Sequence, residues 1–98
     1  MNFLIRNNAK IANKYIRFAK WKLRKLHKKF STFDYTEIFI QQISNQPSVY
    51  YAVVKLGVRG PDLVVSAKAD NLKLLWAVLF GKIKRQLRKH NSKTNYYN

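Results

Sequence analysis

The stretch VYYAVVKLGVRGPDLVVSAKADN, residues 49–71, decides the fold. Apolar side chains occupy every second position over 50–58, with Lys55 on the other face, which is the pattern of a half-buried strand. Residues 59–62, Arg-Gly-Pro-Asp, then turn the chain back. The alternation resumes over 63–69, so the stretch predicts two strands joined by a short turn.

A helix is predicted over 72–90, directly after this stretch. Asp70 or Asn71 can accept its first backbone N–H bonds as a cap. Its inner stripe recurs every three or four residues, at Leu72, Leu75, Trp76, Leu79, Ile83 and Leu87. The first half carries an additional apolar patch, which we expect to be buried by helix curvature rather than to meet a partner protein, formed by Leu74, Val78 and Phe80.

Three more elements are predicted toward the N-terminus. Residues 35–43 are rich in aromatic and β-branched side chains, which favours a strand, and a turn follows at 44–48. Residues 10–30 predict a helix whose apolar stripe is Ala12, Tyr15, Ile16, Ala19, Leu23, Leu26 and Phe30. Residues 1–7 alternate weakly and predict a short first strand. The resulting order, βαβββα, defines an α+β fold.

Length and charge set the class of the protein. A chain of 98 residues can bury one modest core, so we expect a single domain over 1–90 and a flexible polar tail over 91–98. The chain has 20 Lys and Arg against 4 Asp and Glu, a net charge of +16, so its default partner is a polyanion. The absence of cysteine and of a secretory signal or membrane span agrees with a cytoplasmic protein.

Catalytic residues are not apparent. The four carboxylates do not form an acid–base pair, because three lie at predicted turns and one is alone in a strand: Asp34, Asp62, Asp70 and Glu37. His27 and His90 lie in basic helix ends, where we expect solvated side chains. The glycines near 57–60 flank a turn and do not form a phosphate loop. We therefore predict a protein that is not an enzyme and that holds neither a cofactor nor a metal ion.

Two cationic ladders carry the functional signal. Each has spacing i, i+3, i+7: one is Lys22, Lys25 and Lys29, and the other is Lys82, Arg85 and Lys89. The two predicted helices contain 15 Lys and Arg and no acid, and each cation can contact a separate phosphate and release its counterions. Trp21 either stacks on an unpaired base or packs laterally in the protein. The predicted RNA-binding residues are Lys14, Arg17, Trp21, Lys22, Lys25, Lys28, Lys29, Lys82, Arg85, Gln86, Arg88 and Lys89.

The chain resembles the short ribosome hibernation-promoting factors, also called ribosome-associated inhibitors or S30EA proteins. The family's closing motif K-L-x-R-Q-L-x-K is matched here by Lys82, Ile83, Arg85, Gln86, Leu87 and Lys89. Its first-helix motif K-L-x-K is matched by Lys25, Leu26 and Lys28, and its last strand reads like residues 63–67. The match departs from the usual pattern at Ala77, Val78, Gly81 and Lys84.

The resemblance implies a fold, a partner and a mechanism. The fold is a four-stranded sheet with two helices packed side by side on one face. The partner is a 30S-type small ribosomal subunit, bound through 16S-type rRNA, with ribosomal proteins near the decoding channel as further contacts. Inhibition occurs by occlusion of messenger RNA and of the A-site and P-site transfer RNAs. From the same resemblance we expect the free protein to be a monomer without membrane contact, like short forms that lack the domain through which long forms pair ribosomes.

Two other functions fit the same charge pattern. A constitutive ribosomal or general RNA-binding protein would occupy its RNA during rapid growth and would not compete with transfer RNA. A membrane-surface or protein-partner module would use the apolar patch together with the basic helices.

Overall fold

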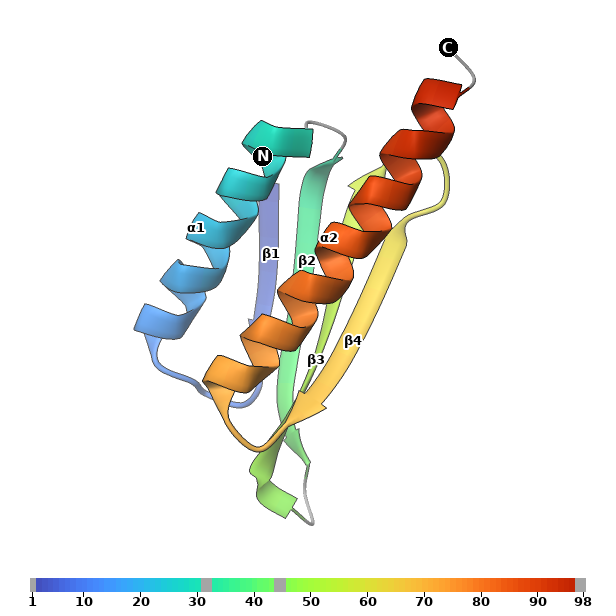
Figure 1. The fold of residues 1–98 in the computed structure, drawn as a ribbon. Helices are drawn as coiled ribbons and strands as arrows, with labels where there is room; N and C mark the ends of the chain where they lie inside the picture. Colours follow the sequence, from blue (N-terminus) through green and yellow to red (C-terminus); the bar gives the residue numbers. More distant parts are fainter. Residues whose placement is uncertain (1, 31–32, 44–45, 97–98) are drawn as a thin grey trace.

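The computed structural model describes residues 2–30, 33–43 and 46–96, which form four strands and two helices. Their order is βαβββα, as predicted (Figure 1). The elements are β1 (Asn2–Asn7), α1 (Asn13–Phe30), β2 (Phe33–Ile43), β3 (Gln46–Val58), β4 (Leu63–Ala69) and α2 (Leu72–Tyr96).

The strands form a mixed sheet in the order β1-β2-β3-β4. β1 is parallel to β2, and the remaining pairs are antiparallel. A parallel pair needs a crossover connection, and α1 supplies it between β1 and β2. The register places Ile5, Ile38, Val54 and Val65 side by side across the sheet, and all four belong to the core or pack against it.

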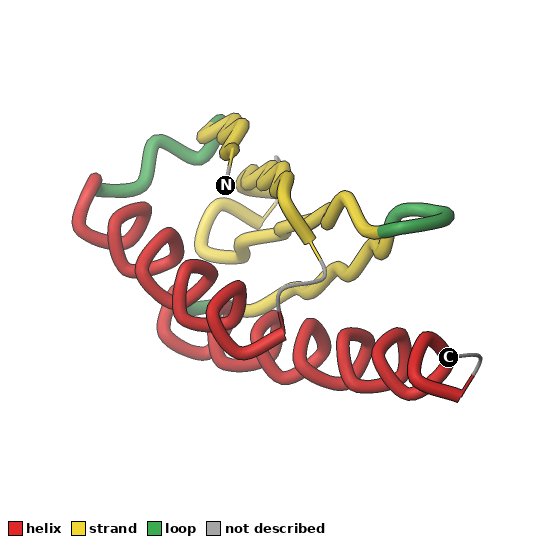
Figure 2. The backbone as a smooth tube through the Cα atoms, turned by 90° about the horizontal axis from the view of Figure 1, so that it is seen from above, coloured by secondary structure: helices red, strands yellow, loops and turns green. Residues whose placement is uncertain are grey.

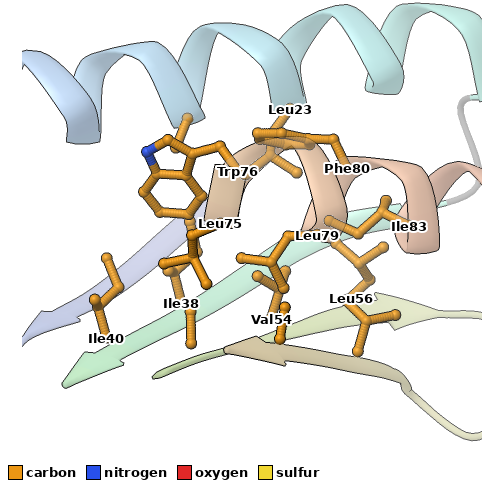
Figure 3. Packing of buried hydrophobic residues seen from close by; sticks show 14 of the residues in the cluster. Leu23, Ile38, Ile40, Val54, Leu56, Leu75, Trp76, Leu79, Phe80 and Ile83 are labelled. Carbon is orange, nitrogen blue, oxygen red and sulfur yellow. The ribbon is translucent and has the colours of Figure 1, made fainter. Parts of the chain in front are cut away.

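Both helices cover the same face of the sheet, so the molecule has two layers (Figures 1 and 2). The core lies between these layers. Figure 3 shows side chains of α2 pointing toward those of β2 and β3, among them Leu75, Leu79, Ile83, Ile38 and Val54. The predicted α+β architecture with two helices on one face is confirmed.

Asparagine side chains bond to the backbone at the start of α2 and in the loop before α1. Asn71 Oδ1 accepts a bond of 2.7 Å from the backbone N–H of Leu74, so Asn71 is the residue that caps α2. At the other helix, Asn7 accepts from the N–H of Ile11 at 3.0 Å and donates to its carbonyl at 2.9 Å. With Lys10 at φ 54°, this clamp holds the chain in a loop until α1 begins. The predicted start of α1 at residue 10 was therefore too early, and Ala12 is exposed.

The end of α2 was also predicted wrongly. The helix continues through the expected end at His90 to Tyr96. Residues 91–96 are polar but contain neither Gly nor Pro, so nothing in this segment stops the helix. The mobility of the tail stays a prediction, and residues 97–98 lie outside the described part of the chain.

The predicted apolar patch on α2 divides in the structure. Phe80 is 5% exposed and lies beside Trp76, with ring centroids 6.1 Å apart. Leu74 and Val78 remain 49% and 37% exposed, so their expected burial is wrong. The cause is helical phase: Phe80 lies on the side of α2 that meets α1, whereas Leu74 and Val78 do not.

Candidate nucleic-acid interface

The two helices carry most of the positive charge of the protein. They contain 15 of its 20 Lys and Arg and no Asp or Glu. Within the described residues the ion pairs are His27–Asp34 and Lys55–Asp62, and neither involves a Lys or Arg of a helix. The positive charge of the helix layer is therefore not neutralised within the described part of the protein.

Aromatic rings position several of these cations. Lys25 Nζ lies 4.2 Å from the centroid of the Trp21 ring, and Lys22 Nζ lies 5.9 Å from that of Phe80. A ring face attracts a cation through its quadrupole but carries no net charge. These contacts orient the side chains while leaving their full charge available to an external anion.

A groove runs along the line where α1 and α2 meet. It consists of three hollows that share lining residues, with volumes of about 420, 420 and 240 Å³. We call it the inter-helix groove. Its α1 wall is Lys14, Tyr15, Phe18, Lys22, Lys25, Leu26 and Lys29, and its α2 wall is Lys73, Trp76, Ala77, Phe80, Gly81 and Lys84.

A second groove lies on the other side of α2, against β4. We call it the edge groove, and its lining is Val64, Val65, Ser66, Lys82, Arg85 and Gln86. Lys82 Nζ donates a hydrogen bond of 2.6 Å to the backbone carbonyl of Ser66. Because β4 is a terminal strand of the described sheet, this bond occupies one of its outward-facing backbone groups.

The structure separates the two predicted ladders. The first ladder, Lys22 to Lys29, lines the inter-helix groove, whereas Lys82 and Arg85 of the second line the edge groove. The α2 cation in the same hollow as the first ladder is Lys84. A single RNA strand therefore cannot be held between the two predicted ladders, and binding through both would place α2 itself between two lines of contact.

The predicted binding residues include only four that line the inter-helix groove, and those left out include Phe18, Lys73 and Lys84. A usable signal was present for the α2 members. Residues 73, 77, 80, 81 and 84 form one helical stripe beside the buried one, at spacings of three and four. That stripe shows which α2 residues share a side, but it does not show which neighbour the side meets.

The remaining predicted residues are exposed. Arg17, Lys28, Arg88 and Lys89 line neither groove. Trp21 is 49% exposed, with its ring 6.1 Å from that of Phe18, which is itself 42% exposed. The alternative in which Trp21 packs into the sheet or the other helix is not what the structure shows, and part of the ring remains accessible.

The sequence suggested solvated histidines, but both contact other parts of the protein: His27 contacts the start of β2, and His90 contacts the turn after β3. His27 Nε2 lies 3.4 Å from Asp34 Oδ1, and its ring stands edge-on to Phe33 with centroids 5.5 Å apart. His90 Nε2 donates a bond of 3.0 Å to the carbonyl of Arg59. Each therefore connects a helix to one end of a strand.

Two features are absent from residues 2–30, 33–43 and 46–96. Neither helix there is both long enough and apolar enough to cross a membrane. In the same residues, His, Asp and Glu side chains do not gather in groups of three or more that could hold a metal ion.

Solved structures share this fold. A ribosomal subunit interface protein from Coxiella burnetii aligns with 94% of this chain and 99% of its own, at a TM-score of 0.80 and 15% identity. The N-terminal domain of Protein Y from Thermus thermophilus aligns with 92% of this chain and 99% of its own, at a TM-score of 0.73 and 15% identity. No protein-family profile matches the chain, and a search of curated proteins finds no relative. The resemblance seen in the sequence thus extends to the fold over nearly the whole chain.

Proposed function

We propose that this protein binds the small ribosomal subunit through its helix layer and halts translation by occluding the messenger RNA and the A-site and P-site transfer RNAs. The observation that carries the proposal is the combination of an acid-free basic helix layer with the fold of a ribosomal subunit interface protein. We infer that it acts in the cytoplasm, as a monomer when free, and without catalysis or a cofactor.

Physical reasoning supports a long RNA contact. Parallel lines of cations on both sides of α2 suit a structured RNA, because each Lys or Arg can neutralise a different phosphate. The exposed Trp21 ring, held between Phe18 and Lys25, adds a surface on which an unpaired base can stack. Inhibition then requires affinity and bulk rather than chemistry.

The decisive experiment is competition on purified small subunits. The protein is mixed with subunits at physiological salt, P-site transfer RNA is added, and sedimentation measures how much protein remains bound. Displacement by transfer RNA is the expected result. Stable co-binding would favour the constitutive ribosomal protein, and a lack of binding would contradict ribosome association itself.

A second measurement separates a hibernation factor from a constitutive protein. Subunits are prepared from growing and from stationary or stressed cells of the source organism, and the bound protein is quantified in each. We expect enrichment in stationary cells. Equal occupancy in growing cells would remove the hibernation role while leaving RNA binding intact.

A further inference from the structure

The inter-helix groove differs chemically from a surface built only for phosphates. Its base contains Trp76 and Phe80, which are 3% and 5% exposed, and Phe18 stands at its side. Figure 3 shows the rings of Trp76 and Phe80 in the space between the two helices. Above this buried base, Phe18 is 42% exposed and Ala77 is exposed, and phosphate contacts alone would leave both in water.

The rim of the groove is uniformly positive. Six lysines line its three hollows: Lys14, Lys22, Lys25, Lys29, Lys73 and Lys84. No carboxylate is among the lining residues. An occupant that matches both the base and the rim must carry apolar groups in the middle and negative charges along both sides.

A nucleobase fits this groove poorly. A base has both donors and acceptors along its edge, whereas the polar side chains that line the groove are lysines and Tyr15. The nearly buried rings of Trp76 and Phe80 also leave little face for stacking. Among the lining rings of α1 and α2, Phe18 has substantial exposure, at 42%, and the more exposed Trp21, at 49%, lies outside the groove lining.

The α2 wall leaves room for a third helix. Ala77 and Gly81 are exposed and lie one helical turn apart, and a Cβ atom added at Gly81 would meet no atom within 4 Å. Small residues at this spacing allow close approach of another helix. The groove follows α1 from Lys14 to Lys29, about 22 Å at 1.5 Å per residue, which is the length of a helix of about 15 residues.

From these features we propose that the inter-helix groove docks an acidic amphipathic helix of a partner protein. The partner's apolar stripe lies against the exposed part of Phe18 and the small residues Ala77 and Gly81, and its Glu and Asp side chains pair with the lysines of the rim. This interaction goes beyond ribosome binding, because it uses Lys73 and Lys84, which belong to neither predicted RNA ladder.

The test uses a synthetic probe and the full chain. The probe is a peptide of about 15 residues with leucine at i, i+3, i+7 and i+10 and glutamate flanking them, and its control is a scrambled peptide of the same composition. Calorimetry is run at about 0.3 M salt, where screening suppresses non-specific attraction to a chain of +16 charge. Only the ordered peptide forms a continuous leucine stripe that the groove can bury. We therefore expect the ordered peptide to bind at least about tenfold more tightly than the scrambled peptide.

Two variants locate the binding. Gly81→Leu places a side chain in the open space of the groove, so it should weaken binding of the ordered peptide about tenfold. Leucine also has the higher helix propensity, so the protein should not lose stability. Val78→Leu puts the same side chain on the same helix outside the groove lining, and we expect no effect. Equal binding of both peptides, or equal binding by both variants, would overturn the proposal.

A pair of charge variants separates this proposal from ribosome binding. Lys73→Glu with Lys84→Glu should abolish peptide binding and weaken small-subunit binding less than a reversal of two ladder residues does, because neither residue belongs to a predicted RNA ladder. Arg85→Glu with Lys89→Glu, of equal charge change, should do the reverse. If Gly81→Leu instead weakens binding of a single-stranded RNA oligonucleotide and leaves peptide binding unchanged, the groove is an RNA site and the proposal is wrong.

Discussion

The two sides of α2 carry the same kind of charge but differ in what lies beneath it. On the α1 side, lysines surround aromatic rings in a hollow without other polar side chains except Tyr15. On the β4 side, Lys82 and Arg85 stand beside strand backbone, and Lys82 is bonded to the carbonyl of Ser66. The comparison teaches that net charge selects a polyanionic partner, whereas the surface between the charges selects which partner.

The largest expected effect comes from weakening the core packing beneath α2, which holds both sides of this helix in place. Leu79 lies on the buried face of α2, and Leu79→Ala should lower the free energy of unfolding by about 2 to 5 kcal/mol because it leaves a cavity. Leu74 is 49% exposed on the same helix, so Leu74→Ala should cost less than about 0.5 kcal/mol. Chemical denaturation measures both, and similar losses would contradict the assigned phase of α2.

Reversing three cations should give the next largest effect. Lys25→Glu, Arg85→Glu and Lys89→Glu together remove contacts on both sides of α2, and we expect small-subunit binding to weaken roughly 100-fold at physiological salt. The slope of log K against log salt should fall by about 2 to 3.

A control of equal charge tests whether position matters. Arg6, Arg59 and Lys68 are exposed outside the helix layer, and their reversal to Glu should leave most of the affinity and of the salt slope. A loss as large as that of the helix variant would mean that total charge, and not the helix layer, determines binding.

Trp21 is predicted to contribute through stacking. Trp21→Ala should weaken binding of single-stranded RNA by about 1 to 3 kcal/mol if one base stacks on the ring. Because the ring is half exposed, the free energy of unfolding should change little. Fluorescence titration and denaturation check the two parts, and a large loss of stability with unchanged RNA affinity would make Trp21 a packing residue.

The smallest expected effect comes from removing a single charge, and it compares the two sides of α2 most directly. Lys82→Met and Lys84→Met each remove one charge and keep most of the stem, two residues apart on α2. We expect Lys82→Met to weaken small-subunit binding roughly fivefold, because one phosphate contact is lost. Lys84→Met should mainly weaken binding of the acidic peptide. Identical profiles for the two variants would mean that the sides of α2 are not specialised.

Much of the fold was readable because its signals are local. Alternation in residues 50–58 and 63–69 identified β3 and β4, since successive side chains of a strand face opposite sides. The stripe containing Leu75, Leu79 and Ile83 gave the buried side of α2 for the same kind of reason. Helix ends were less readable, because the Asn7 clamp and the continuation to Tyr96 depend on hydrogen bonds and on missing stop signals.

The site was readable as a list of cations but not as surfaces. The sequence identified the ladder residues, yet their separation by α2 depends on where α1 and β4 lie relative to that helix. Lys84 was passed over because the α1 residues that share its hollow, Lys22 and Lys25 among them, are distant from it in the chain. Periodicity shows which residues of one helix share a face, but a groove between two helices also depends on how the helices pack against each other.

The bond from Lys82 to the Ser66 carbonyl also bears on self-association. β4 is a terminal strand of the described sheet, and open edge strands invite pairing with another copy, which leads to aggregation. A strand added there would have to displace the Lys82 ammonium group and bring a second highly positive molecule alongside. The lysine predicted to bind phosphate therefore also opposes pairing of β4 with another copy of the protein.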